Sequence, residues 1–361
     1  MEKEYEMRKL VELARELERQ KQSKKDFIVP SEQIRTMYDI GKKTIRLSLP
    51  TANNDPHDVE LFGITDTCHD QLAQKTKIPT QFYRRLKEDH PELLVRNINE
   101  LIQEKDKRLV RVLDGNVRAL LSDRYRIIDN YDVLFNAMDQ FKTLNTENDA
   151  RIFVKRADLS ETRLYVKAIS DRLKDTIFTN KEKPEVGDMV EGGIIIMNSE
   201  VGAGAYKVMP FMNVLKCQNG MISEESFTKV HLGRSKSIGQ IDWSDETLSL
   251  EDAALWSKIS DMIKGTFDPE IFMKWVDRIN DKASTVIEKP ILAVNNVVKN
   301  YDLPKSKAEE LLSQFSQEGF TQWGLCNAVT AVAKNETNYD RQIELEKLGT
   351  RLMEVEVEEL Q

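Results

Sequence analysis

The sequence predicts an α+β fold: a central antiparallel sheet of β-hairpins with flanking helices, followed by a helical C-terminal region. In the middle of the chain, apolar and polar residues alternate in runs that turn residues separate. From about residue 248 onwards, apolar residues instead recur every three or four positions, which is the helical period. We expect a charged N-terminal helix at 1–25, an α+β core domain at 26–240 and a helical, acidic region at 241–361.

The first elements are expected to be helices. Met7, Leu10, Ala14 and Leu17 form a thin apolar stripe along residues 1–25. This helix either packs on its own chain or docks on a neighbouring subunit. Two short helices follow between residues 66 and 89, and Pro79 opens the second. Without a clear recognition helix, structural packing is favoured over helix-turn-helix DNA binding.

Three β-hairpins are expected next. Their strands pair 108–113 with 117–122, 151–157 with 162–170, and 193–198 with 205–212. Asp114-Gly115-Asn116 is a strong hairpin turn in the first pair, and Gly202-Ala203-Gly204 turns the third. The strands therefore predict a mainly antiparallel sheet.

The last third of the chain predicts helices. Asp268 is the expected N-cap of one helix, with Pro269 at its first position. Further helices are expected to begin near Pro304 and Phe320. The final helix carries a broken apolar stripe, formed by Leu345, Leu348, Leu352 and Val355, before an acidic tail.

The net charge of −8 at pH 7 is unevenly distributed. Residues 241–361 carry 13 Lys and Arg against 23 Asp and Glu, whereas residues 1–240 carry 40 against 38. Because salt screens charges over about 8–10 Å, the local pattern matters more than the total. An acidic chain is therefore compatible with a local basic surface that binds nucleic acid.

Several classes of protein do not fit the sequence. No apolar run reaches the roughly 18 residues of a membrane span, and the N-terminus lacks the apolar core of a signal peptide. Three widely spaced cysteines predict no disulfide framework, so we expect a cytoplasmic protein. Metal and phosphate-loop motifs are missing, and we expect neither a cofactor nor catalysis. For Cys217 and His231, a structural role is favoured over a nucleophile–base pair.

The second predicted hairpin carries the most informative pattern. Strand alternation places cations and aromatic rings on one side of it, opposite the apolar residues. We call this set the basic–aromatic face: Arg151, Phe153, Lys155, Arg163, Tyr165 and Lys167. Cations neutralise phosphates, and aromatic rings stack on bases, so the face is typical of single-stranded nucleic-acid binding. The alternative is an ordinary solvated sheet face.

A second, weaker set of basic and aromatic residues follows the first hairpin. It consists of Arg118, Arg124, Tyr125 and Arg126, whose alternative role is ion pairing with Asp123 and Asp129. Residues 201–240 add an excess of basic residues, with five Lys and Arg against two Glu. From that stretch we include Lys207 and Lys216 as candidate nucleic-acid contacts.

Four short motifs occur in order along the chain. They are 118–126 (RALLSDRYR), 198–202 (NSEVG), 217–220 (CQNG) and a downstream His231. Together they resemble a phage- and plasmid-type family called domain of unknown function 932, over roughly residues 30–330. An arginine is expected shortly before the third motif, where Lys216 stands instead. The 198–200 group is either a functional site or a turn whose polar side chains satisfy the backbone.

The resemblance implies a mobile-element setting in a bacterial host cell, without a settled activity. The order of hairpins and helices is also similar in outline to single-strand annealing proteins of the Rad-fifty-two type. We therefore expect a non-catalytic protein that binds single-stranded DNA in recombination or replication. We also expect a homo-oligomer whose terminal helices contribute to subunit contacts. The alternative function is an interaction protein that counteracts or regulates a host defence protein through its acidic C-terminal region.

Overall fold

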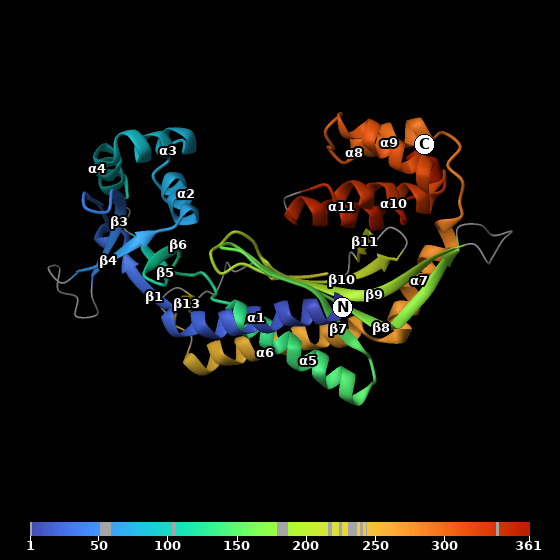
Figure 1. The fold of residues 1–361 in the computed structure, drawn as a ribbon, viewed down its shortest axis with the longest axis horizontal. Helices are drawn as coiled ribbons and strands as arrows, with labels where there is room; N and C mark the ends of the chain where they lie inside the picture. Colours follow the sequence, from blue (N-terminus) through green and yellow to red (C-terminus); the bar gives the residue numbers. More distant parts are fainter. Residues whose placement is uncertain are drawn as a thin grey trace.

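The computed structural model describes residues 2–50, 59–102, 106–178, 187–215, 219–223, 226–229, 237–238, 241–242, 244–336 and 339–361. It confirms the α+β class and the helical C-terminal region. The predicted central sheet is two larger sheets in the structure, with one short two-stranded pair besides. Figure 1 shows an N-terminal lobe and a C-terminal lobe that rise from opposite ends of a common base.

The N-terminal lobe contains the first six-stranded sheet, in the order β1-β5-β6-β4-β3-β2. Its strands are β1 (Lys25–Pro30), β2 (Arg35–Asp39), β3 (Thr44–Pro50), β4 (Val59–Ile64), β5 (Lys107–Leu113) and β6 (Asn116–Ser122). A 3₁₀ turn, Ser31–Gln33, follows β1. The β5–β6 hairpin is the first predicted pair, and Asp114 and Gly115 adopt the positive φ angles that its tight turn requires. The two predicted short helices are α2 (Asp66–Lys75) and α3 (Thr80–Asp89), and α4 (Pro91–Leu101) follows them.

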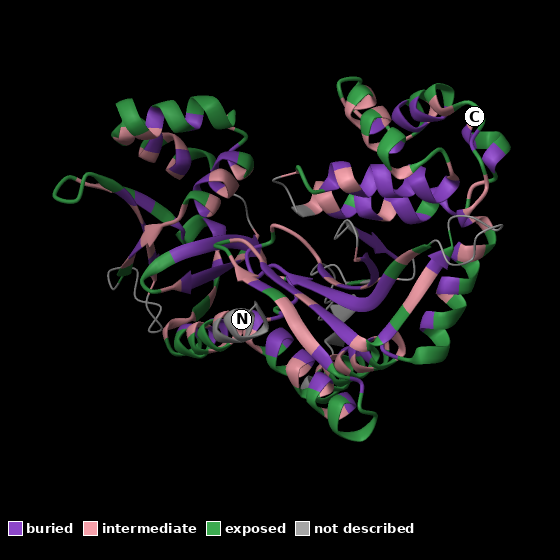
Figure 2. Ribbon diagram, turned by 45° about the vertical axis from the view of Figure 1, so that its right-hand side comes forward, coloured by how far each residue is buried: buried purple, intermediate pink, exposed green. Residues whose placement is uncertain are grey.

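The base contains the second sheet, in the order β11-β10-β9-β8-β7, and all its pairings are antiparallel. Its strands are β7 (Ile152–Leu159), β8 (Leu164–Phe178), β9 (Gly187–Asn198), β10 (Tyr206–Val214) and β11 (Asn219–Ile222), and β12 (Phe227–Lys229) also pairs with β10. The remaining pair is β13 (Ser237–Ile238) with β14 (Ile241–Asp242). The second and third predicted hairpins are thus the β7–β8 and β9–β10 pairs of this sheet. Strand residues are buried along most of its length (Figure 2).

Helices cover both faces of the second sheet. The helices of the base are α1 (Glu2–Ser23), α5 (Asn130–Glu147), α6 (Asp245–Thr266) and α7 (Pro269–Ala283). The C-terminal lobe contains α8 (Pro290–Asn300), α9 (Lys307–Glu318), α10 (Gln322–Ala333), α11 (Tyr339–Leu352) and α12 (Val357–Leu360). In Figure 1, α1, α5 and α6 lie below the sheet, and α10 and α11 lie above it. The predicted N-cap of α7 is confirmed, since the Asp268 carboxylate accepts from the backbone N–H of Glu270 at 2.8 Å.

The base and the C-terminal lobe share one hydrophobic core. It includes Leu13 and Leu17 of α1 together with Leu345, Leu348 and Leu352 of α11, all buried. Leu17 and the three leucines of α11 belong to the predicted terminal stripes, so these side chains pack inside their own chain and are not available for subunit contacts. The N-terminal lobe has a separate core, built only from its own strands and helices.

Strand β8 is longer than its neighbour β7, which accompanies it only as far as Ser170. Asn280 of α7 lies against the part of β8 that extends beyond Ser170. Its side-chain amide donates to the carbonyl oxygen of Thr176 at 3.2 Å, and its side-chain oxygen accepts from the backbone N–H of Phe178 at 2.7 Å. One side chain thus replaces a strand neighbour at the edge of the sheet.

Gly193 lies where the second sheet tolerates no side chain. A Cβ at this position would lie 2.3 Å from the carbonyl oxygen of Ala168 and 2.6 Å from the ring of Phe211. We predict that Gly193→Ala lowers the free energy of unfolding by about 1–3 kcal/mol in urea denaturation. As the control, a Cβ on Gly265 would lie 3.7 Å from its nearest neighbour, Ile271, so Gly265→Ala should be neutral or stabilising. Equal stability of the two variants would contradict this account.

Candidate nucleic-acid interface

A buried charge cluster joins the N-terminal lobe to the base. Its centre is the carboxylate of Glu200, in the connection between β9 and β10, with a side chain only 1% exposed. It accepts from Lys24 Nζ at 2.5 Å, from Arg118 Nη2 at 2.7 Å and from the backbone N–H of Asn130 at 2.7 Å. We call this the Glu200 hub. It connects the end of α1, strand β6, the start of α5 and the β9–β10 connection.

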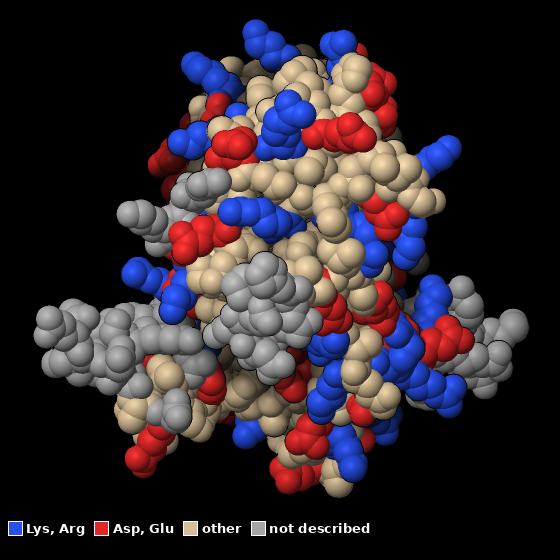
Figure 3. Space-filling view, turned by 90° about the vertical axis from the view of Figure 1, so that its left-hand side faces the viewer, with Lys and Arg blue, Asp and Glu red and all other residues tan. Residues whose placement is uncertain are grey.

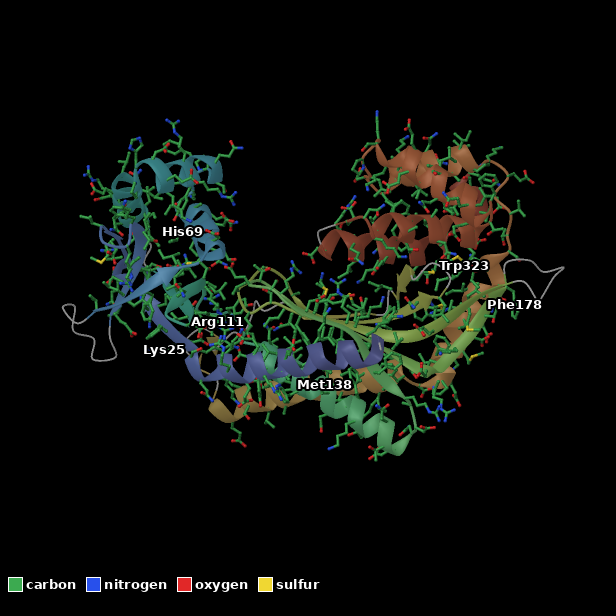
Figure 4. All side chains as sticks on the ribbon, in the orientation of Figure 1. Lys25, His69, Arg111, Met138, Phe178 and Trp323 are labelled. Carbon is green, nitrogen blue, oxygen red and sulfur yellow. The ribbon has the colours of Figure 1, made fainter. Side chains whose placement is uncertain are left out.

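Arg111 of β5 is the second centre of the hub and is fully buried (Figure 4). Its guanidinium donates to both carboxylate oxygens of Asp26, to Asp129 at 2.7 Å and to the backbone oxygen of Glu200 at 3.1 Å. Burial opposes ionisation, but Asp129 and Asp26 outweigh it and raise the pKa of Arg111 above its ordinary value. For Asp129 burial is also the opposing effect, and Arg111 and Lys24 outweigh it to lower the pKa.

The other residues of the 198–200 motif satisfy buried backbone groups. Asn198 donates to the carbonyl oxygen of Ile128 at 2.8 Å. The hydroxyl of Ser199 accepts from the backbone N–H of Ala203 at 3.0 Å, and the Ser199 carbonyl accepts from the Tyr125 hydroxyl at 2.9 Å. Of the two roles left open by the sequence, these contacts favour the structural one, because they fix the β9–β10 turn.

The second set of predicted site residues is divided by the structure. Arg118 and Tyr125 are buried in and beside the hub, and Arg126 is buried against Asp252 of α6 at 2.5 Å. These three side chains stabilise the junction and do not face solvent. Only Arg124 of this set is exposed. Lys216 lies outside the described residues, as do Cys217 and His231.

The basic–aromatic face is largely confirmed as a single face but not as an open one. Phe153 packs with Tyr165 and the ring of Phe211 above the second sheet, and we call this side the upper face. Tyr165 is buried, whereas Phe153 and Lys155 are half-buried. Ile343 of α11 belongs to the same apolar cluster, so the C-terminal lobe covers part of the face. Arg151 is excluded, because it precedes β7 and lies beside Asp149 at an exposed corner.

A β-bulge adds a cation that the alternation pattern missed. The β7–β8 register shifts between Val154 and Arg156, so Arg156 lies opposite Lys167. Lys155 also reaches Glu191, at 3.5 Å. Simple alternation would put adjacent residues 155 and 156 on opposite faces, and the sequence offers no signal for the bulge. Lys155, Arg156, Arg163, Lys167 and Lys207 form the set that we call the upper-face cations.

Two of these cations share one carboxylate from the C-terminal lobe. Asp340, in the first turn of α11, accepts from Arg163 at 3.0 Å and lies 3.3 Å from Lys207 Nζ. Arg163 also donates to the carbonyl oxygen of Ala203 at 2.5 Å, in the turn that the hub fixes. Partial burial opposes ionisation of Asp340, but the hydrogen bonds and charges of Arg163 and Lys207 together outweigh it and lower the pKa.

Lys167 lies deeper than the other upper-face cations. Its ammonium is 4.3 Å from the ring centroid of Phe211, and burial lowers its pKa to about 8. Glu346 of α11 acts against that shift, and its own pKa is raised because it is buried. The upper face thus brings together charges that are costly to hold in a low-dielectric environment.

A crevice of about 470 Å³ lies between the N-terminal lobe and the β9–β10 turn. Lys75 and Arg108 line one side of it, and Gly202 and Gly204 line the other. A Cβ on Gly204 would lie 2.8 Å from Arg163 Nη1, so the crevice reaches an upper-face cation. The crevice therefore connects the upper face with the N-terminal lobe, where Arg108 is paired with Asp106 at 2.5 Å.

Other chemistry has weaker support in the described part of the chain. A cavity of about 670 Å³ lies against α6 and α7 and is lined by Phe272 and Trp275 with charged residues around them. Burial raises the pKa values of Cys68 and Cys326, which makes both thiols poor nucleophiles. The described residues contain no cluster of three metal-ligating side chains. Among the described helices, none has both the length and the apolar composition needed to cross a bilayer.

Comparison with known proteins found no matching family model, curated protein or solved structure. The resemblance carried by the four motifs therefore stays a prediction.

Replacing Glu200 tests the hub. Glu200→Gln leaves Arg118 buried without its carboxylate and Lys24 with only the longer contact to Asp129 at 3.4 Å, so we predict a loss of about 3–5 kcal/mol in the free energy of unfolding. Urea denaturation measures this loss. The control is Glu161→Gln, at an exposed position, which should cost less than about 0.5 kcal/mol. A similarly small effect at Glu200 would mean that the hub does not hold the lobes together.

The lowered pKa of Lys167 predicts a specific pH dependence of the free energy of unfolding. Its pKa is about 8 in the fold against an ordinary 10.5, so the unfolded chain binds more protons between these values. Stability should therefore rise as the pH increases through 8 to 10.5. We predict that Lys167→Met is more stable than the parent protein by about 1–3 kcal/mol at pH 7 and that the difference shrinks across that window. Lys142→Met, at an exposed position, is the control and should show no such trend.

Proposed function

We propose that this chain binds single-stranded nucleic acid on the upper face of the second sheet, without catalysis. The observation that carries the proposal is the grouping of five cations with Phe153 and Tyr165 on one face, next to a crevice. The sheet itself supplies five cations to this face against two carboxylates, Asp158 and Glu191. This excess of three positive charges favours a polyanion.

The aromatic residues have different roles in the proposal. Phe153 is only half-buried, whereas Tyr165 is buried, so the ring of Phe153 is the one we assign to base stacking. Tyr165 is buried and lies beneath Arg156, whose guanidinium carbon is 5.4 Å from the ring centroid. Tyr165 therefore positions a phosphate-binding guanidinium and does not itself stack on a base.

The resemblance to a phage- and plasmid-type family gives the proposal its setting, which is recombination or replication of a mobile element. Binding through cations and one ring favours single strands over duplexes, because stacking needs an unpaired base. The predicted homo-oligomer belongs to the same proposal, since several copies on one strand would bind with avidity. With the terminal stripes buried, subunit contacts would have to use other surfaces.

Salt-dependent binding tests the proposal. We predict that the triple variant Lys155→Gln, Arg156→Gln and Arg163→Gln weakens binding to an oligothymidylate by tenfold or more at low salt. The slope of log affinity against log salt should fall by about 2, since each lost phosphate contact removes about 0.7. Fluorescence anisotropy at several salt concentrations measures both quantities.

The matched control removes three cations from α3 of the N-terminal lobe. Arg84, Arg85 and Lys87 each lie within 4 Å of an aspartate, and Lys and Arg side chains are interspersed with Asp and Glu on the outer side of that lobe (Figure 3). Changing all three to Gln alters the net charge equally and should change affinity less than about twofold. Equal losses in both triple variants, or no binding by the parent protein, would reject the upper face as the site.

A further inference from the structure

Helix α11 lies on the same cations that the proposed function assigns to nucleic acid. Asp340, in the N-terminal turn of this helix, contacts Arg163 and Lys207. Glu346, about two turns later, carries a negative charge that acts to raise the pKa of Lys167. Glu346 also lies close to Phe211, since its carboxylate and that ring are both near Gly220. These two carboxylates reduce the excess charge of the upper face from three to one.

The two ends of α11 are held in different ways. Its C-terminal part is anchored by the buried side chains of Leu348 and Leu352 and by a bond from the Thr350 hydroxyl to the carbonyl oxygen of Ile222 at 2.7 Å. At the N-terminal turn, the Asp340 side chain is 40% exposed, and the contacts described for it are ionic. Ionic contacts near solvent are weak and sensitive to salt, whereas a buried apolar anchor is not.

A carboxylate that bridges an arginine and a lysine resembles a bound phosphate. Both groups present negatively charged oxygens to the same donors, and an arginine fork accepts either in a bidentate manner. Arg163 already contacts both oxygens of Asp340. A nucleic-acid phosphate and Asp340 therefore cannot use this pair of cations at the same time.

We propose that the N-terminal turn of α11 makes an autoinhibitory contact. Asp340 occupies a phosphate position on Arg163 and Lys207 until a single-stranded nucleic acid displaces it. This inference rests on the proposed function and adds its regulation. Displacement moves only the first turn, since the rest of the helix stays in the core. The affinity for nucleic acid is thus set by competition between the Asp340 carboxylate and a phosphate of the nucleic acid.

The first test removes the internal competitor. Asp340→Asn keeps the shape of the side chain and abolishes its charge, so the variant should bind an oligothymidylate about fivefold more tightly than the parent protein at low salt. Glu344→Gln is the matched control: it lies on the same helix, its described contact is with Arg341, and its affinity should stay within twofold of the parent. Unchanged or weaker binding by Asp340→Asn would overturn the autoinhibitory contact.

A second measurement uses the parent protein, so it does not depend on how a variant folds. Hydrogen exchange of the backbone amides at 339–346 should speed up when the oligothymidylate is added, because the first turn leaves the sheet. Slower exchange there would mean that the strand binds over an undisplaced helix, which contradicts the proposal. If neither the parent nor Asp340→Asn binds the oligonucleotide, the proposed function itself fails. Binding by both with equal affinity rejects only the regulation.

Discussion

The carboxylate of Glu200 joins parts of the chain that are far apart in the sequence, beside a small apolar cluster in which Val201 packs with Leu109 and Leu121. A buried carboxylate is stable only when charged donors surround it, and here the donors come from α1, β6 and the start of α5. Because these elements belong to both the N-terminal lobe and the base, one electrostatic requirement fixes the junction. The β9–β10 turn is fixed with it, and through the carbonyl of Ala203 so is the position of Arg163. The candidate interface therefore depends on a cluster that contacts no ligand itself.

The upper face illustrates the opposite use of charge. In the hub, three carboxylates are matched by three cations, and Glu200 and Arg111 at its two centres are buried, which gives rigidity. On the upper face, the sheet carries more cations than carboxylates, and the balance comes from a helix near the other end of the chain. Lys167 shows the cost of this arrangement, since burial already disfavours its charged form. Such a surface is poorly explained by stability alone and is typical of a site built for an anionic ligand.

The sequence predicted those elements whose signals are local. The turn at Asp114-Gly115 and the cap at Asp268-Pro269 act within a few residues, and both appear where they were expected. Helix α5 was missed, although it has 18 residues. The division into two sheets could not be predicted either, because pairings such as β1 with β5 join segments about 80 residues apart and leave no local pattern.

The alternation pattern predicted which side chains share a face of the sheet but not which other parts of the chain cover that face. Alternation correctly placed Phe153, Tyr165 and Lys167 on one side of a sheet. It did not reveal that Asp340, some 175 residues later in the chain, would lie on that side. Arg118 was assigned to the interface by its charge, whereas its buried partner Glu200 assigns it to the junction. Residue type indicates which interactions a side chain can make. Tertiary contacts decide whether the side chain makes them with solvent or with a neighbouring residue.

The shared core of the base also constrains the order in which the protein folds. The N-terminal lobe draws its core from residues between Val29 and Leu120, so it can assemble soon after that stretch leaves the ribosome. The core of the base joins Leu13 to Leu360, so it cannot close until nearly all of the chain described here has been synthesised. During that interval α1, which is made before the rest of the base, exposes its leucines. Non-local contacts of this kind slow folding and leave apolar surface open to association, so chaperones that bind nascent chains would have their longest opportunity at the N-terminal helix.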